Sequence, residues 1–133
     1  ISQKDKILLE RAIMVLATSF GTPPSLYKAA KDIGVEVSSL EKALKTGVKL
    51  GDVVMIKKNR YLPKSSVTKL AIVVEQLAAQ SNDGLFTTAN YRDEVNLGRN
   101  FVIDVLEYFD RKGFTMQVGN HRRVQCSADS IFL

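Results

Sequence analysis

Residues 98–124 read GRNFVIDVLEYFDRKGFTMQVGNHRRV, and this stretch decides the fold. Its first part places apolar residues three or four positions apart, the spacing of one buried helix face. That face consists of Phe101, Val102, Val105, Leu106 and Phe109. Gly113 ends the helix, and a strand pattern leads into a hairpin whose tip, Asn120–Arg123, is polar and cationic. The stretch predicts a helix followed directly by a β-hairpin.

The first half of the chain repeats this order. Residues 39–44 form a short helical stripe, residues 52–57 a strand, Lys58-Asn59 a turn and residues 60–62 a returning strand. Each half also opens with a long amphipathic helix. The expected buried faces are Leu9, Ala12, Ile13, Leu16 and Phe20 in the first half, and Val67, Leu70, Ala71, Val74, Leu77 and Ala78 in the second.

Three helices closed by a two-stranded wing define a winged helix, and a repeat of half the chain indicates two copies rather than a solenoid. We therefore predict a mainly α protein with small β-hairpin wings, built as two tandem winged-helix domains. The expected domains are residues 1–64, which are basic, and residues 65–133. Pro63-Lys64-Ser65-Ser66 is expected to be a short linker between them.

Short polar residues and glycines set the expected ends of the helices. The first helix should start near residues 2–5 and stop at Phe20-Gly21. Ser38 and Glu41 have capping-box spacing, which places the start of the third helix at Ser39. In the second half, Leu85-Phe86-Thr87 should add a short strand to the hairpin sheet, and Thr87 or Thr88 should cap the next helix.

Positive charge is concentrated in the first half. Up to Lys64 there are 12 Lys and Arg against 6 Asp and Glu, a net +6, and from Ser65 onward 7 against 8, a net −1. Each cation set beside a phosphate can release a condensed counterion, so this excess favours a polyanionic partner for the first domain. A lysine-rich solvated surface explains the composition equally well.

Other features of the sequence limit the class of protein and its cellular environment. Cys126 is the single cysteine, which excludes an internal disulfide and a cysteine-cluster zinc site. No apolar run approaches the roughly 20 residues that a membrane helix needs. We expect a monomeric, cytoplasmic protein with no membrane contact and no metal or cofactor. The chain opens on helix-forming sequence without Met, so we also expect a fragment of a longer protein.

Candidate nucleic-acid contacts lie at two places in the second domain. Gly98-Arg99-Asn100 opens a helix, where backbone amides and the helix dipole favour a phosphate and Arg99 adds a fork of donors. The wing tip supplies His121-Arg122-Arg123. One alternative stays open: Asn120 holds the turn, the histidine is solvated, and one of the two arginines pairs with a carboxylate such as Asp110.

The first domain offers lysines instead. Three lysines lie three or four positions apart on its third helix and gather on one exposed side, where a solvated face is the alternative: Lys42, Lys45 and Lys49. Three residues of its wing are expected to contact a second stretch of backbone or ribosomal RNA without base selectivity: Lys57, Lys58 and Arg60. Tyr61 on this wing is expected to be better exposed than the aromatic residues of the second domain, Tyr108, Phe109 and Phe114.

Enzymatic signatures are absent from the sequence. His121 is the single histidine and has no cysteine nucleophile nearby in sequence, and neither a G-x-x-x-x-G-K-[ST] nor a G-x-G-x-x-G phosphate loop occurs. Asp93-Glu94 and Asp110 are expected to be solvated helix acids. We therefore expect a binding module and not an enzyme.

Motifs across the second domain carry a family resemblance. They are Tyr91-Arg92-Asp93-Glu94-Val95, Leu97-Gly98-Arg99-Asn100, residues 105–111, Gly113-Phe114-Thr115, Val118-Gly119-Asn120 and Arg122. Together they closely resemble the C-terminal winged-helix region of the bacterial selenocysteine-specific elongation factor. The resemblance is specific over the second domain and architectural over the first, so the motifs cover about half of the chain.

The resemblance implies a function. In that family four winged helices follow the translation-factor core, and the last one binds the mRNA hairpin that marks a UGA codon for selenocysteine insertion. By resemblance, this chain looks like the last two of the four, its partner is an mRNA hairpin, and the GTP-binding and tRNA-binding parts lie outside it. The parent factor would be a GTPase, and this part would tether it to the message.

The resemblance also implies which residues meet the RNA. One group would meet the backbone and loop of the hairpin: Arg92, Gly98, Arg99 and Asn100. A second group would line the other edge of the site: Gly119, Asn120, His121 and Arg122. The sequence departs from the family at Met116-Gln117, where more basic strand residues are expected, so fewer phosphate contacts are expected along that strand.

Two other functions remain open at this stage. The first is a double-stranded DNA reader, against which we count three helix acids that would repel phosphates in a major groove: Asp104, Glu107 and Asp110. The second is a protein-interaction module in which no nucleic acid binds.

Overall fold

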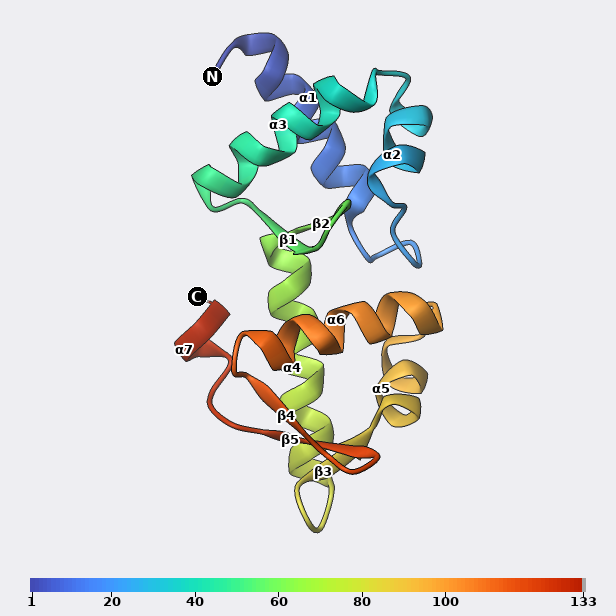
Figure 1. The fold of residues 1–133 in the computed structure, drawn as a ribbon, viewed down its shortest axis with the longest axis vertical. Coiled ribbons are helices and arrows are strands. Elements are labelled where there is room, and N and C mark those ends of the chain that lie inside the picture. Colours follow the sequence, from blue (N-terminus) through green and yellow to red (C-terminus); the bar gives the residue numbers. More distant parts are fainter. Residues whose placement is uncertain (133) are drawn as a thin grey trace. The chain divides into compact units, whose positions relative to one another are not determined.

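A computed structural model describes residues 1–132 and divides the chain into two compact units, Ile1–Ser66 and the part from Val67 onward. The first unit contains three helices and one hairpin (Figure 1). Its elements are α1 (Gln3–Leu16), α2 (Leu26–Ile33), α3 (Val37–Leu50), β1 (Val53–Lys57) and β2 (Arg60–Pro63). β1 and β2 pair antiparallel, with an irregularity in register between Met55 and Lys57.

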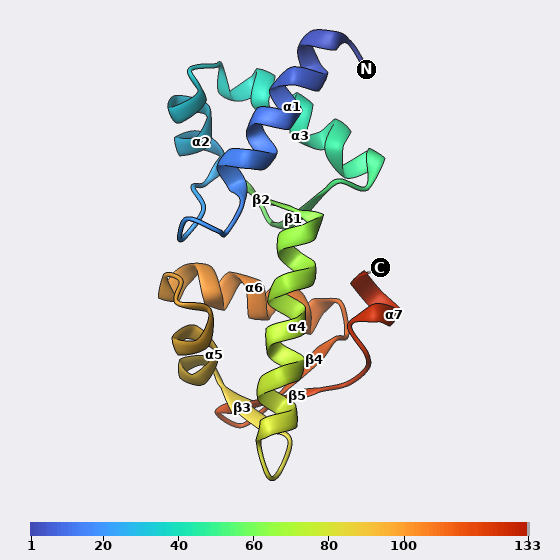
Figure 2. The same cartoon turned by 180° about the vertical axis from the view of Figure 1, so that it is seen from behind.

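The second unit repeats this order and adds a strand and a short helix, seen from both sides in Figures 1 and 2. Its elements are α4 (Lys64–Gln80), β3 (Leu85–Thr87), α5 (Thr88–Val95), α6 (Arg99–Arg111), β4 (Thr115–Val118), β5 (His121–Val124) and α7 (Asp129–Phe132). The three strands form one antiparallel sheet in the order β3-β5-β4. The predicted fold class, mainly α with two hairpin wings, is confirmed, as is the short strand at residues 85–87.

Several predicted element ends need correction. α1 ends at Leu16 and not at Phe20, because Ala17 turns extended (ψ 151°), and the Phe20 side chain is 97% exposed instead of joining the core. α3 begins at Val37 with Glu36 as its N-cap, two residues before the predicted start. The expected linker is not a loop either, since β2 ends at Pro63 and α4 begins at Lys64.

The long helices of the two units are related by a constant interval of 62 residues, which is the spacing between Gly34 and Asn96, the left-handed C-caps of α2 and α5. At this interval the core residues of α1 match those of α4, and those of α3 match those of α6. The buried pairs are Leu8 and Leu70, Leu9 and Ala71, Ala12 and Val74, Leu40 and Val102, Ala43 and Val105, and Leu44 and Leu106. The internal repeat predicted from the sequence is therefore a repeat of the core.

One core position differs greatly in size between the units. Gly47 of α3 packs so closely that an added Cβ would lie 2.8 Å from Leu9 Cδ1 and 2.8 Å from Val53 Cγ2. Its counterpart 62 residues later, Phe109, is fully buried, and the counterpart of Leu9 is Ala71. The bulky side chain thus stands on the first helix of one unit and on the third helix of the other. Phe109 packs in an aromatic cluster with Phe114 and Phe132, with ring centroids 5.2 to 5.3 Å apart.

Gly47→Ala is expected to destabilise the first unit by about 1 kcal/mol. Overpacking costs about 1–3 kcal/mol, and the better helix propensity of alanine returns up to about 1 kcal/mol. Urea denaturation followed by far-UV circular dichroism measures the change. In a Leu9→Ala background the same substitution should cost less, because one of the two nearest methyl groups is gone. A stabilised Gly47→Ala protein would contradict this close packing.

Candidate nucleic-acid interface

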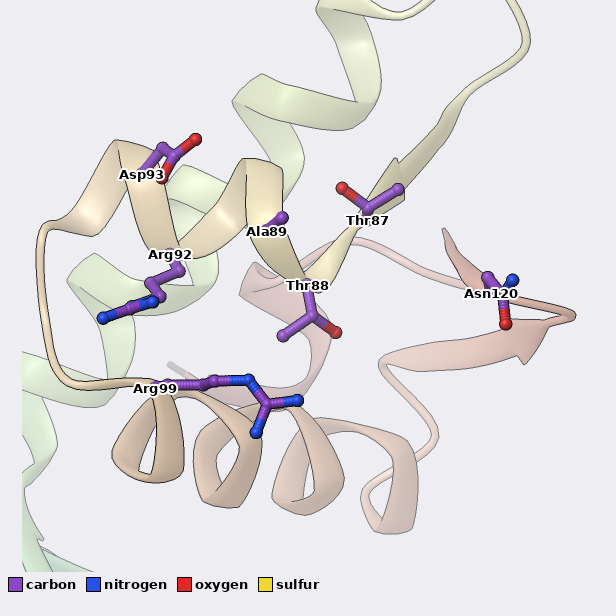
Figure 3. Close-up of a pocket in the computed structure, with 7 residues that line it drawn as sticks. All are labelled: Thr87, Thr88, Ala89, Arg92, Asp93, Arg99 and Asn120. Atoms are coloured by element: carbon purple, nitrogen blue, oxygen red, sulfur yellow. The ribbon is translucent and has the colours of Figure 1, made fainter.

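The second unit carries a pocket of about 410 Å³ where α5, the start of α6 and the tip of the β4–β5 hairpin meet. It is lined by Thr87, Thr88, Ala89, Arg92, Asp93, Arg99 and Asn120. Figure 3 shows the Arg92 and Arg99 side chains over the start of α6, with Thr88 facing them and Asn120 on the hairpin. The pocket therefore brings together three predicted contact residues, two from the helices and one from the wing.

Local structure explains how the two arginines reach the same pocket. Arg92 lies in the last turn of α5, and Arg99 is the first residue of α6. The turn between them is tight because Asn96 adopts a left-handed conformation (φ 55°) and Leu97 is 8% exposed. A short turn held by a buried leucine fixes both helix ends at the mouth of the pocket.

The electrostatics of the pocket favour an anion. Both arginines are exposed and Asp93 is the one acid in the lining, so the charged side chains sum to a net +1. Gly98 is the N-cap of α6 and has no side chain to cap the helix, whereas Thr87 and Asn90 form a capping box on α5. The positive end of the α6 dipole adds to the cationic side chains at this pocket.

Arg122 does not present its charge to the surface, which corrects its prediction as an RNA contact. The residue is 7% exposed, and its Nη2 donates to Asp110 Oδ2 at 2.9 Å. Its Nε lies 3.2 Å from both Asp110 oxygens, and its Nη1 donates to Thr88 Oγ1 at 3.2 Å. Thr115 Oγ1 also donates to Asp110 at 2.6 Å. The alternative considered for one wing arginine, pairing with Asp110, is the one that the structure contains.

This ion pair gives Arg122 a positioning role. It joins β5 to the C-terminal half of α6 through Asp110 and to the start of α5 through Thr88. Thr88 is itself part of the pocket lining. Arg122 therefore holds the wing against the two helices that, with the hairpin tip, form the pocket.

The neighbours of Arg122 on β5 point the other way. His121 and Arg123 are exposed, as strand alternation requires when the residue between them is buried. Hydrogen bonds from Ser81 and the Leu85 amide are the main causes of a lowered Asp83 pKa, and His121 adds a smaller electrostatic contribution. His121 and Arg123 are not among the lining residues of the pocket. Their place is beside it, on the outer face of the sheet.

The remaining predicted contacts of the second unit lie next to the pocket. Asn100 is exposed in the first turn of α6, directly after Arg99. Gly119 adopts a left-handed conformation (φ 63°) in the hairpin turn, which explains a glycine there and places Asn120 at the tip. Met116 and Gln117, the positions that depart from the family, are both exposed on β4.

The wing of the first unit differs from the prediction at two residues. Lys57 and Lys58 are exposed, but Arg60 is half-buried and its Nη1 donates to the Pro23 carbonyl at 2.7 Å. Tyr61 is 2% exposed and not the exposed aromatic that was expected; burial is the main cause of its raised pKa. On β2 the side chains nearest the hairpin turn thus serve mainly to hold the wing in place.

Sequence reasoning missed four lining residues of the pocket: Thr87, Thr88, Ala89 and Asp93. The two threonines were considered only as candidate helix caps and, for Thr87, as the end of a strand. Thr87 does cap α5, accepting from the Asn90 backbone N–H at 3.0 Å. Asp93 was expected to be an ordinary solvated acid. Only the position of the wing against α5 turns these residues into a pocket, and no local pattern encodes that position.

The described residues show neither a membrane span nor a metal site. No helix within residues 1–132 is long and apolar enough to cross a membrane. No group of three or more histidine, cysteine, aspartate or glutamate side chains in the same range is placed to hold a metal ion.

The fold and the pocket define a tandem winged-helix protein whose second copy forms a cationic pocket between its helices and its wing. Residues 78–124 match the family described as "Elongation factor SelB, winged helix". The selenocysteine-specific elongation factor of Escherichia coli (strain K12) is 32% identical over 102 residues, which cover 76% of this chain and 16% of that protein. The factor of Haemophilus influenzae is 29% identical over 91 residues, covering 68% and 14%.

A solved structure matches nearly the whole chain. It is titled "Structure of the mRNA-binding domain of elongation factor SelB from E.coli in complex with SECIS RNA" and has a TM-score of 0.81 at 25% identity, covering 95% of this chain and all of that one. The matches confirm the resemblance found in the sequence: this chain is similar to the winged-helix region of the selenocysteine-specific elongation factors. It spans about one sixth of the length of the curated relatives it matches.

Proposed function

We propose that this chain binds an mRNA hairpin, the selenocysteine insertion element, and thereby tethers a translation elongation factor to its message. The observation that carries the proposal is the pocket that gathers Arg92, Arg99 and Asn120. Its support from relatives is the similarity to an mRNA-binding domain solved with SECIS RNA.

The pocket suits an unpaired nucleotide better than a paired one. Its volume, about 410 Å³, falls within the roughly 300–1,000 Å³ of small-ligand sites, so a base turned out of a loop or bulge can enter it. Specific RNA recognition concentrates on such bases because the deep groove of an A-form helix hides base edges. Arg99 supplies a planar fork for a phosphate or a guanine edge, and Asn120 supplies an amide. Binding is noncovalent.

Residues around the pocket extend the proposed contact surface. Within the second unit the contacts are Arg92, Gly98, Arg99, Asn100, Gly119, Asn120, His121 and Arg123, with Arg122 acting through the position of the wing. In the first unit, Lys57 and Lys58, and Arg60 to a lesser degree, meet a second stretch of backbone or ribosomal RNA. Phosphate contacts orient the RNA, and a few base contacts select it.

The wider setting is part of the same proposal. The chain is a noncatalytic, monomeric module of a longer cytoplasmic factor that is a GTPase, and its two functional domains are residues 1–64 and 65–133. The support is the match to a region covering only 16% of the E. coli factor.

The acids of α6 would repel duplex DNA less strongly than the sequence suggested. Of the three acids expected to repel it, Glu107 is exposed, Asp104 is half-buried and Asp110 is paired with Arg122. The pocket, and not the helix acids, is therefore the reason for preferring RNA. The choice between the two nucleic acids needs a direct test.

The test is selection of bound RNAs from a pool of hairpins with random loops, followed by competition with duplex DNA. Enrichment of hairpins that share unpaired bases, and failure of duplex DNA to displace them, is the expected result. Equal displacement by duplex DNA would replace the proposal with a DNA reader. Absence of RNA retention, together with salt-insensitive binding to a protein, would replace it with an interaction module.

A further inference from the structure

The outward side of α3 in the first unit forms a second cationic surface, which we call the lysine face. A hollow of about 370 Å³ there is lined by Ser38, Glu41, Lys42, Lys45, Thr46 and Lys49. All six residues belong to α3, and the three lysines are exposed. Lys45 pairs with Glu41 at 3.6 Å, and Thr46 Oγ1 donates to the Lys42 carbonyl at 3.1 Å. The net side-chain charge of this surface is +2.

The internal repeat shows that the fold does not require these lysines. At the interval of 62 residues their counterparts on α6 are Asp104, Glu107 and Arg111. The buried sides of α3 and α6 match in apolar character, whereas two of these three outward positions reverse their charge. The second unit forms the same fold without these lysines. We therefore attribute the lysines to a role other than folding.

The lysine face also carries an energetic cost in the isolated protein. Like charges three or four positions apart on a helix repel each other and destabilise it. Within the described part of the chain, Lys45 has an acid partner, whereas Lys42 and Lys49 have none. A polyanion bound along α3 would neutralise the repulsion between these lysines. If the lysine face were only solvated, the repulsion would remain.

The geometry, taken with the RNA-binding function proposed above on which this inference rests, points to the phosphate backbone of double-stranded RNA as the ligand of the lysine face. Lysine ammonium groups are compact charges on flexible stems, suited to phosphates and poorly suited to bidentate reading of base edges. The hydroxyls of Ser38 and Thr46 offer neutral partners on the same face. The first unit thus binds any RNA duplex through its third helix, separately from the hairpin pocket proposed for the second unit.

A loop-free RNA duplex of about 16 base pairs isolates this contact, because it offers the pocket of the second unit no unpaired base. The test variant is Lys42→Gln, Lys45→Gln, Lys49→Gln. The matched control is Lys4→Gln, Lys6→Gln, Lys31→Gln, which removes the same charge from exposed lysines of α1 and α2. Affinity is measured by fluorescence anisotropy between about 50 and about 200 mM salt, and circular dichroism verifies folding.

Loss of the lysine face should weaken duplex binding about tenfold or more and lower the log–log salt slope by about 2 to 3, whereas the control should change neither by as much. Loop preference among hairpins should persist in the test variant, and Arg99→Ala should keep duplex binding, so this inference and the hairpin proposal fail independently. Equal losses in test and control would reduce the effect to net charge and overturn the inference. Failure of the wild-type protein to bind the duplex, or binding of an acidic protein instead, would also overturn it.

Discussion

Asp110→Ala is expected to lower the unfolding free energy of the second unit by about 3 kcal/mol, near the lower end of the cost of breaking a buried ion pair. The Arg122 side chain is 8% exposed, and the substitution leaves its guanidinium without the Asp110 carboxylate. It also removes the acceptor of Thr115 Oγ1. Because Asp110 itself is 25% exposed, water can enter and keep the loss from being larger. Urea denaturation monitored by circular dichroism measures the change.

The chain supplies its own control for this experiment. Lys28 and Asp32 form an ion pair at 3.2 Å whose side chains are 68% and 42% exposed, so Asp32→Ala should cost only about 0.2–1 kcal/mol. Arg122→Met should cost less than Asp110→Ala, because an apolar side chain then fills the buried place. The double substitution should be less damaging than the sum of its parts. Equal costs for Asp110→Ala and Asp32→Ala would show that the pair does not hold the wing.

Arg99→Ala is expected to weaken hairpin binding by about 1–3 kcal/mol, a loss of roughly five- to 150-fold in affinity, and to reduce discrimination between loop sequences. The side chain lies in the pocket beside Arg92, where its planar fork can meet a phosphate and a base edge together. Arg99→Lys should recover part of the affinity and little of the discrimination, since an ammonium keeps the charge but loses the fork. A gel-shift titration with two hairpins of different loop sequence measures both quantities.

Lys112→Ala is the matched control for this measurement. Lys112 is exposed at the C-terminal end of α6, the helix that Arg99 begins. Its substitution therefore removes one positive charge away from the pocket. It should change affinity slightly and discrimination not at all. Unchanged affinity and selectivity in Arg99→Ala would remove Arg99 from the site and count heavily against the pocket as the reading surface.

The sequence predicted the helices and the repeat because both depend on local periodicity. Apolar spacing located the buried faces of α3 and α6, and Gly113 marked the end of α6, where it adopts a left-handed conformation (φ 76°). It failed at Phe20, because periodicity continued past the residue where the backbone turns extended. The start of α3 was wrong because Glu36, and not Ser38, is the N-cap, so the helix begins at Val37, two residues before the predicted start.

The candidate site was predictable only in part. Arg92, Arg99 and Asn120 could be named from their positions at helix ends and a turn, and the structure places all three in one pocket. Arg122 and Tyr61 were misjudged because alternation along a short strand gives two possible faces, and pairing with a distant element decides between them. For Arg122 the distant element is α6, where Asp110 accepts its hydrogen bonds from twelve positions earlier in the chain. A prediction from charge alone therefore put Arg122 on the surface, whereas it pairs with Asp110 and holds the wing.

The constant interval of 62 residues between the two units separates the residues that build the fold from those free to change. Apart from Gly47 and Phe109, the inward positions of α3 and α6 are apolar in both units, whereas two of the three lysine positions of α3 carry acids in α6. Stability and target choice are thus encoded by separate sets of residues on the same helix. A winged helix can therefore acquire a different ligand through a few substitutions on the outward side of its third helix, without loss of the apolar side that holds the fold together.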